Sequence, residues 1–183
     1  MAAVILEKDK MDLVLERMAR ELVENHGRFD RAVLIGLQPR GIYLSRNLKK
    51  KLETILKSSI NNYGELDITF YRDDFRTRSE PLVPNEMNID FSIEGKEVVL
   101  IDDVIYSGRS LRAALDALLD FGRPDKVEFM SLIDRRFSRQ LPVEPDYIGM
   151  SVDSRSYERV KVEWRETEGE NQVWLVPENS AHQ

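Results

Sequence analysis

Residues 98–110 read VVLIDDVIYSGRS, and this stretch decides the fold class. It begins with a continuous apolar run over residues 98–101, which is typical of a strand buried on both faces. Two acids follow, Asp102 and Asp103, and a Ser-Gly turn at 107–108 then opens a helical pattern. A buried strand that passes through a short turn into a helix is the repeating unit of a parallel α/β sheet.

The same alternation of strands and helices continues on both sides of this stretch. It predicts an α/β fold with a mostly parallel central sheet and flanking helices, in one domain over residues 1–183. Residues 160–164 and 173–176 add a predicted C-terminal β-hairpin. The other predicted strands cover residues 32–35, 66–71, 127–133 and 147–148, and the predicted helices follow apolar spacing over residues 11–22, 43–52 and 111–118.

The composition excludes several classes of protein. With 183 residues, 42% of them hydrophobic, the chain is long enough for a core, and it has no apolar run that could span a membrane. It has no cysteine, which excludes disulfide scaffolds, thiolate metal sites and thiol nucleophiles. The 27 Lys and Arg residues against 33 Asp and Glu residues give a net charge of −6, so the chain is not a general nucleic-acid binder.

Two further expectations concern location and the histidines. The charged N-terminus lacks the apolar segment of a secretory signal, and we expect a cytoplasmic protein with no membrane partner. The two histidines, His26 and His182, are expected at a helix end, beside Gly27, and in a tail. Neither belongs to a predicted catalytic or metal-binding cluster.

The two acids and the turn together predict a site for a phosphorylated sugar. Adjacent carboxylates at the end of a buried strand are costly unless a cation or sugar hydroxyls meet them. The Ser-Gly turn directs backbone N–H groups and hydroxyls at one point, and the start of the helix adds positive potential, which suits a phosphate monoester. Two other interpretations stay open: a plain polar turn, and the acid pair of a receiver domain. A receiver pair ends the first strand of its domain, whereas this pair lies past mid-chain.

A second turn and a long loop complete the candidate site. Residues 36–41 carry the two outer glycines of a P-loop but lack the lysine and hydroxyl that should follow, which excludes a nucleotide triphosphatase. This turn still ends a strand and opens a helix, so it is able to present N–H groups to an anion beside Arg40. Residues 72–89 contain no periodic pattern, and their length predicts a mobile functional loop. Arg72 follows the preceding strand directly and is the arginine of this loop that we expect to act.

These motifs resemble those of the type I phosphoribosyltransferases, whose motif for phosphoribosyl pyrophosphate (PRPP) has an apolar strand, two acids and a Ser/Thr-Gly turn. Within that family the chain is most similar to pyrimidine-operon regulators that are also uracil phosphoribosyltransferases. The resemblance runs from about residue 3 to about residue 176. Besides residues 98–110, it rests on the stretches 40–44, 67–74, 80–83, 116–124 and 141–149.

The resemblance implies a reaction and a set of residues. Uracil would displace pyrophosphate from PRPP to give UMP, with Mg²⁺ as the cofactor, and the protein would be a homo-oligomer. The implied catalytic residues are Asp102, Asp103 and Arg72, and the two acids would also hold the metal through ribose hydroxyls or water. The implied PRPP-binding residues are Arg40, Gly41, Tyr106, Ser107, Gly108, Arg109 and Ser110, and the implied base-binding residues are Asp134 and Arg135.

One alternative is a phosphoribosyltransferase for another base. Purine-using members commonly have an acid at the position of Tyr106, where it is thought to handle a proton on the base. A tyrosine, with a pKa of about 10, replaces that acid poorly. The residue therefore favours a pyrimidine, although it would also serve simply by packing over the ribose.

The other alternative is a regulator that senses UMP or PRPP and binds RNA. The candidate RNA-binding residues are Arg135, Arg136 and Arg139, the densest basic group in the chain. The family's Gly-His pair is absent here, one residue is inserted near Ser138, and Met150 replaces a usual lysine. With a net charge of −6 as well, we expect weak or absent sequence-specific RNA binding.

Overall fold

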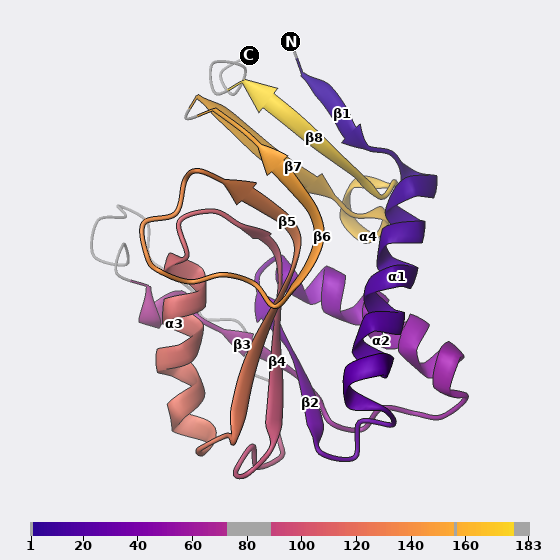
Figure 1. The fold of residues 1–183 in the computed structure, drawn as a ribbon, viewed down its shortest axis with the longest axis vertical. Coiled ribbons are helices and arrows are strands. Elements are labelled where there is room, and N and C mark those ends of the chain that lie inside the picture. Colours follow the sequence, from indigo (N-terminus) through magenta and orange to yellow (C-terminus); the bar gives the residue numbers. More distant parts are fainter. Residues whose placement is uncertain (1, 73–88, 156, 178–183) are drawn as a thin grey trace.

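The computed structural model describes residues 2–72, 89–155 and 157–177. Five parallel strands form the central sheet in the order β3-β2-β4-β5-β6 (Figure 1). The predicted α/β fold is therefore confirmed. Most of the predicted mobile loop, residues 73–88, lies outside the described residues, as does His182. The strands are β2 (Ala32–Gln38), β3 (Tyr63–Asp67), β4 (Glu97–Ile105), β5 (Lys126–Arg136) and β6 (Tyr147–Asp153).

Three long helices cover the two faces of the central sheet. Helices α1 (Lys8–His26) and α2 (Gly41–Leu56) pack on one face, and α3 (Arg109–Leu118) packs on the other, as Figure 1 shows. The helical spacing read from the sequence is confirmed, because each helix buries most of its apolar positions; Leu13 of α1 and Leu115 of α3 are exposed. The fully buried side chains of α1 and α2 include Met11, Leu15, Met18, Leu22, Leu44, Leu48 and Leu52.

A second, three-stranded antiparallel sheet, the small sheet, has the order β1-β8-β7. The predicted hairpin is confirmed as its β7 (Glu158–Glu163) and β8 (Gln172–Pro177), with the short helix α4 (Arg165–Glu168) between them. Its third strand, β1 (Ala3–Leu6), was not predicted, because four residues at the start of a chain carry too little pattern. Figure 1 shows the small sheet beyond the ends of the central strands, on the side where β5 and β6 turn toward it.

Several element boundaries differ from the prediction. The strand predicted over residues 66–71 ends at Asp67, because the Asp67 carboxylate accepts hydrogen bonds from both the backbone and the hydroxyl of Thr69 and turns the chain into a 3₁₀ helix, η1 (Thr69–Tyr71). Strand β4 continues past residue 101, so the two acids lie within it, and Asp102 is in register with Ser131 of β5.

A polar network joins the amino ends of the central strands to the end of α1. His26 is the last residue of α1, as expected, and its side chain is only 2% exposed. Its Nδ1 lies 3.1 Å from the Glu97 carboxylate and its Nε2 lies 2.7 Å from the Glu128 carboxylate. The Tyr147 hydroxyl donates to Glu128 over 3.0 Å. This network connects α1 with β4, β5 and β6.

Over residues 2–72, 89–155 and 157–177, no helix has both the length and the apolar character that crossing a membrane requires.

Candidate active site

The two adjacent acids lie near the carboxyl end of β4, in the middle of the central sheet. The Asp102 carboxylate accepts the backbone N–H of Asp103 over 2.9 Å, and Asp103 is 8% exposed. Burial and the negative charge of Asp103 raise the pKa of Asp102 well above its ordinary value. Burial raises the pKa of Asp103 as well, against the lowering effect of the Arg40 guanidinium. Two carboxylates in this state favour a cation or hydroxyl donors.

Two arginines from the other predicted motifs reach these acids. Arg40, at the start of α2, places its Nε 3.6 Å from the Asp103 carboxylate. Arg72, which follows η1, acts on Asp102 through its positive charge and lowers the pKa of that acid from the value that burial alone would set. The structure thus brings together side chains from β4, the β2–α2 turn and the residue that follows η1.

Gly41 allows this close assembly. A Cβ atom at Gly41 would lie 2.5 Å from the carbonyl oxygen of Ile101 and 3.0 Å from the Asp102 carboxylate. Only a glycine lets the first turn of α2 approach the end of β4 so closely. The contact places the N-terminus of α2 beside the acid pair, where its free N–H groups attract an anion.

The Ser-Gly turn (residues 106–110) follows β4 and begins α3. Gly108 precedes the helix with a φ of 89°, a conformation that glycine adopts at low cost. The Ser107 hydroxyl accepts the N–H of Arg109 over 3.4 Å, and Ser110 is already in the first turn of α3. Backbone N–H groups at such a helix start are suited to a phosphate group.

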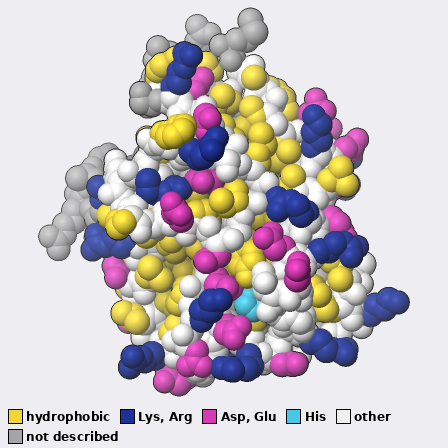
Figure 2. All heavy atoms as spheres, viewed as in Figure 1, with side chains coloured by type: hydrophobic (Ala, Val, Ile, Leu, Met, Phe, Trp, Pro, Cys, Tyr) yellow, Lys and Arg dark blue, Asp and Glu magenta, His cyan; other side chains and the backbone are white. Residues whose placement is uncertain are grey.

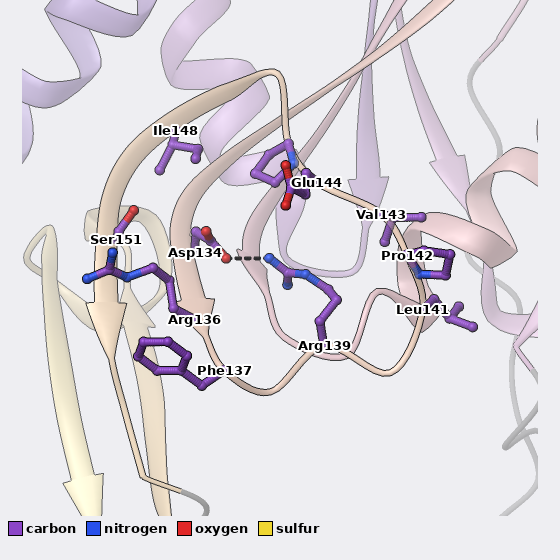
Figure 3. Close-up of a pocket in the computed structure, with 11 residues that line it drawn as sticks. Asp134, Arg136, Phe137, Arg139, Leu141, Pro142, Val143, Glu144, Ile148 and Ser151 are labelled. Carbon is purple, nitrogen blue, oxygen red and sulfur yellow. Dashed lines mark hydrogen bonds and ion pairs between the residues drawn. The ribbon is translucent and has the colours of Figure 1, made fainter.

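The proposed base-binding residues lie at the end of β5, which runs to Arg136 rather than to residue 133. Arg135 is buried, donates to the Ser154 hydroxyl over 2.8 Å, and places its guanidinium 4.0 Å from the centre of the Tyr106 ring. Asp134 points in another direction and lines a cavity of about 750 Å³ beside the Ser-Gly turn (Figure 3). The two residues that were predicted to bind the base together therefore have different neighbours: Arg135 contacts Tyr106 and Ser154, and Asp134 lines the cavity.

The three candidate RNA-binding arginines each have partners within the chain. Besides the contacts of Arg135, the Arg136 guanidinium donates to Asp153 over 2.7 Å, and Arg139 donates to Asp134 over 2.6 Å. Figure 2 shows basic side chains interspersed with acidic ones over the face in view, so the described residues form no continuous basic surface there.

The donor atoms at the acid pair fit Mg²⁺ bound together with a substrate. Among the residues in the described ranges, no group of three or more His, Cys, Asp or Glu side chains is arranged to hold a metal ion by itself. Mg²⁺ prefers oxygen ligands, keeps several waters and is usually bound by one or two carboxylates plus substrate phosphates. Asp102 and Asp103 offer such carboxylates next to the Ser-Gly turn.

Several contacts of Arg40 were not predicted. Arg40 also donates to the Glu168 carboxylate over 3.1 Å and to the carbonyl oxygen of Val162 over 2.5 Å. Its guanidinium lies 5.8 Å from the centre of the Tyr43 ring, which stacks on the buried Trp164. These contacts tie the β2–α2 turn to the small sheet. No local pattern signals the contacts of Arg40 with Glu168 and Val162, because these partners are more than a hundred residues away.

Comparison with known proteins agrees with this geometry. A family profile described as the phosphoribosyl transferase domain matches residues 3–167. The chain therefore belongs to the phosphoribosyltransferase family, and the prediction made from residues 98–110 is confirmed. Within that family it is a member of the group of proteins named bifunctional protein PyrR. One from Elusimicrobium minutum is 39% identical over 180 residues, which cover 98% of this chain and 99% of that protein. One from Desulfosudis oleivorans is 43% identical over 169 residues, which cover 92% and 93%.

Solved structures of phosphoribosyltransferases share the fold. A hypoxanthine phosphoribosyltransferase from Staphylococcus aureus superposes with a TM-score of 0.73 at 18% identity, covering 99% of this chain and 94% of that one. The hypoxanthine phosphoribosyltransferase of Trypanosoma cruzi gives a TM-score of 0.70 at 14% identity, covering 95% of both chains. At these identities the similarity concerns the fold and carries no information about the base.

Proposed function

We propose that this protein is a uracil phosphoribosyltransferase, which converts uracil and PRPP to UMP and pyrophosphate. The observation that carries the proposal is the acid pair Asp102–Asp103, which is directly followed by the Ser-Gly turn and flanked by Arg40. A carboxylate pair next to an anion-binding turn matches a sugar that carries hydroxyls on one side and a phosphate on the other. The bifunctional name of the relatives supports the same assignment.

Each part of the site has a role in this reaction. The Ser-Gly turn binds the 5′-phosphate of PRPP through its backbone N–H groups and hydroxyls. Arg40 and Arg72 contact the pyrophosphate and favour its departure with the bonding electron pair. As the C1′–O bond breaks, positive charge develops on the ribose, and the carboxylates of Asp102 and Asp103 stabilise it. N1 of uracil then forms the new bond to C1′ and gives up its proton to water.

Mg²⁺ is the cofactor in this proposal. Asp102 and Asp103 would hold it through the ribose hydroxyls or through water, which agrees with a carboxylate pair whose burial leaves the negative charges only partly compensated. The bound ion would neutralise charge on the leaving pyrophosphate.

The proposed preference for uracil rests on the residues near the ring of Tyr106. The Arg135 guanidinium makes a cation–π contact with one face of this ring, and Tyr106 remains 40% exposed. No carboxylate occupies this position of the turn, in contrast to the common arrangement in purine-using relatives. A phosphoribosyltransferase for another base is the second candidate of this class.

A regulator that binds RNA in response to UMP or PRPP is a candidate from another class, and it is compatible with the enzyme. The relatives' name favours it. The intrachain partners of Arg135, Arg136 and Arg139 speak against a ready RNA surface, because binding RNA would require each arginine to exchange an internal partner for a phosphate.

The decisive test of the proposed enzyme is a panel of bases with PRPP and Mg²⁺. We expect uracil to give UMP and pyrophosphate and the purines to give no product, and release of pyrophosphate with hypoxanthine but not uracil would overturn the base assignment. If none of the bases in the panel gives a product, the proposed function is overturned. The proposal also includes a homo-oligomer, which light scattering of the purified protein tests, and a cytoplasmic location, which fractionation of the cells tests.

A further inference from the structure

A second segment lies against the Ser-Gly turn and holds its backbone. This bracing segment (residues 137–145) connects β5 to β6 and lines the cavity in Figure 3. The backbone N–H groups of Gln140 and Leu141 donate to the carbonyl oxygen of Ser107 over 3.0 and 3.2 Å. The Gln140 side chain accepts the Nε–H of Arg109 over 2.7 Å. Val143 packs so close to Gly108 that a Cβ atom there would lie 2.5 Å from it.

Arg139 provides the charged part of this brace. Its guanidinium donates to the carbonyl oxygen of Tyr106 over 2.7 Å and to the Asp134 carboxylate over 2.6 Å. The side chains of Arg139 and Asp134 are 21% and 10% exposed, so water screens the pair less than it would at the surface. Figure 3 shows Arg139 extending from the bracing segment toward Asp134 at the end of β5. One guanidinium thus connects a rigid strand to the Ser-Gly turn.

The direction of these bonds fixes the direction of the N–H groups in the turn. The peptides after Tyr106 and Ser107 are trans. In a trans peptide, the carbonyl group and the following N–H point in opposite directions across one plane. Because Arg139 holds the carbonyl of Tyr106, the N–H of Ser107 points away from the bracing segment. Because Gln140 and Leu141 hold the next carbonyl, the N–H of Gly108 does the same.

We propose that Arg139 is a positioning residue of the phosphoribosyltransferase, which uses Asp134 as its anchor to hold the Ser-Gly turn in the phosphate-binding orientation. Arg139 contacts no substrate in this role and acts through the peptide plane that it holds. The inference rests on the proposed function only in taking the anion at this turn to be the 5′-phosphate of PRPP. It assigns to Arg139 a task inside the enzyme, in place of the surface contact with RNA that the sequence suggested.

A purely structural ion pair predicts a different outcome. Such a pair would lower the free energy of unfolding when it is removed and would leave the affinity for phosphate unchanged in the folded protein. A residue that orients N–H groups predicts a selective loss of PRPP affinity, because those groups still exist but no longer converge. Charge-assisted hydrogen bonds to carbonyl and carboxylate groups are strong enough to make this loss about tenfold or more.

The chain offers a matched control for the ion pair. Arg46 of α2 donates from two nitrogens to the Glu65 carboxylate of β3 over 2.7 and 2.8 Å. The Glu65 side chain is 11% exposed, close to the 10% of Asp134. Arg46→Gln therefore removes an ion pair between an arginine and a similarly buried strand carboxylate without touching the Ser-Gly turn, although the Arg46 side chain is 48% exposed against 21% for Arg139.

The experiment compares Arg139→Gln, Arg139→Lys and Arg46→Gln with the wild-type protein. For each variant, the KM for PRPP, the KM for uracil and kcat are measured, and inorganic phosphate is titrated in thermal unfolding. We expect Arg139→Gln to raise the KM for PRPP about tenfold, to change kcat and the KM for uracil less than about threefold, and to lose the phosphate-dependent rise in Tm. Arg139→Lys should recover part of the affinity, since one contact survives, and Arg46→Gln should behave as wild type in affinity.

Two outcomes would overturn the inference. One is an unchanged KM for PRPP and an unchanged phosphate response in Arg139→Gln. The other is an equal rise in KM for Arg46→Gln, which would indicate a general effect of stability. The phosphate titration also separates the two proposals. If the wild-type protein is inactive with PRPP but is stabilised by phosphate, and only the Arg139 variants lack this stabilisation, the proposed reaction is refuted and the role of Arg139 is supported.

Discussion

Carboxylates are buried at both ends of the central sheet, but the pKa of Asp102 at one end and that of Glu128 at the other are shifted in opposite directions. At the carboxyl end, burial and mutual repulsion raise the pKa of Asp102. At the amino end, burial alone would raise the pKa of Glu128, but hydrogen bonds from Lys126 and Tyr147, with the nearby His26, outweigh burial and lower it. The acid pair at the carboxyl end is thus short of partners, whereas Glu128 at the amino end has several.

This difference separates a site from a structural network. A buried charge with incomplete compensation costs stability, and a protein retains it where a ligand completes the compensation. A buried charge with several partners has no comparable attraction for a ligand. The acid pair therefore indicates function, and the network around Glu128 indicates stability. The following predictions test this contrast at each end, from the largest expected effect to the smallest.

The largest effect is expected at the acid pair. Asp102→Asn and Asp103→Asn should each lower kcat/KM for PRPP about 100-fold or more, because each removes a charge that stabilises the ribose cation. The free energy of unfolding should stay the same or increase, since a repulsive buried charge is lost. Steady-state kinetics and urea unfolding measure the two effects. Wild-type rates in both variants would refute the assignment.

Glu128→Gln should show the reverse pattern. We expect it to lower the free energy of unfolding by about 2 kcal/mol near neutral pH, because partners inside the network lose a charged acceptor, and to leave kcat/KM unchanged. Glu97→Gln is the matched control, since Glu97 contacts the same histidine with a side chain that is 34% exposed, and its effect should be smaller. A comparable loss of activity in Glu128→Gln would break the contrast between the two ends.

The same residue makes a prediction about pH. The folded pKa of Glu128 is below its unfolded value of about 4.5, so its stabilising contribution is complete above that value and is lost as the pH falls through the folded pKa. The stability difference between wild type and Glu128→Gln should therefore be present near pH 7 and shrink below about pH 4. A difference that grew on acidification would contradict the lowered pKa.

Two glycines with positive φ test the Ser-Gly turn with a smaller expected effect. Gly108 (φ 89°) has Val143 against it, whereas Gly169 (φ 93°) has open space around it. Alanine at either position should cost about 1 kcal/mol of stability from backbone strain, and Gly108→Ala should cost more than Gly169→Ala because its Cβ would displace Val143. Only Gly108→Ala should also weaken the stabilisation of the protein by inorganic phosphate in thermal unfolding. If both variants respond to phosphate as wild type does, the turn is not the anion site.

The smallest expected effect concerns RNA. We expect binding of the wild-type protein to the leader RNA of its own pyrimidine genes to be weak and sensitive to salt, with and without UMP, because the candidate arginines already have partners. Arg136→Ala should then change the affinity very little. Tight, UMP-dependent binding that survives moderate salt and is lost in Arg136→Ala would show that this surface serves RNA after all.

The contrast between the ends also explains what the sequence was able to predict. The acid pair and the Ser-Gly turn lie in one stretch, so their order alone indicates a strand, a site and a helix. The network around His26 joins residues from four elements, and each of them reads separately as an ordinary polar residue. The contacts of Arg139 with Tyr106 and Asp134 are missed for the same reason, and the sequence offered that arginine only as part of a basic run.

The sequence also predicted the ends of the strands less well than their presence. The end of β3 depends on hydrogen bonds from Thr69 to Asp67, whereas the alternation of apolar residues continues to Tyr71. The apolar pattern stops at Ile101 although β4 continues, because the acids pair with β5 through their backbones. Backbone pairing leaves no trace in side-chain periodicity, so the strands that carry the site were predicted too short.

The pairing of β1 with β8 has a consequence for how the chain is made. Strand β1 is synthesised before the other elements of the structure, yet its Ala3 pairs with Leu175, and β8 lies between β1 and β7 in the small sheet. The central sheet is complete in sequence at Asp153, so it is able to form while β1 still waits for its neighbour. Until β8 emerges, β1 and β7 both present unpaired edges, which favour association between nascent chains. A chain whose synthesis stops before Gln172 would therefore contain the acid pair and the Ser-Gly turn but not the complete small sheet that Arg40 contacts, and it would tend to aggregate.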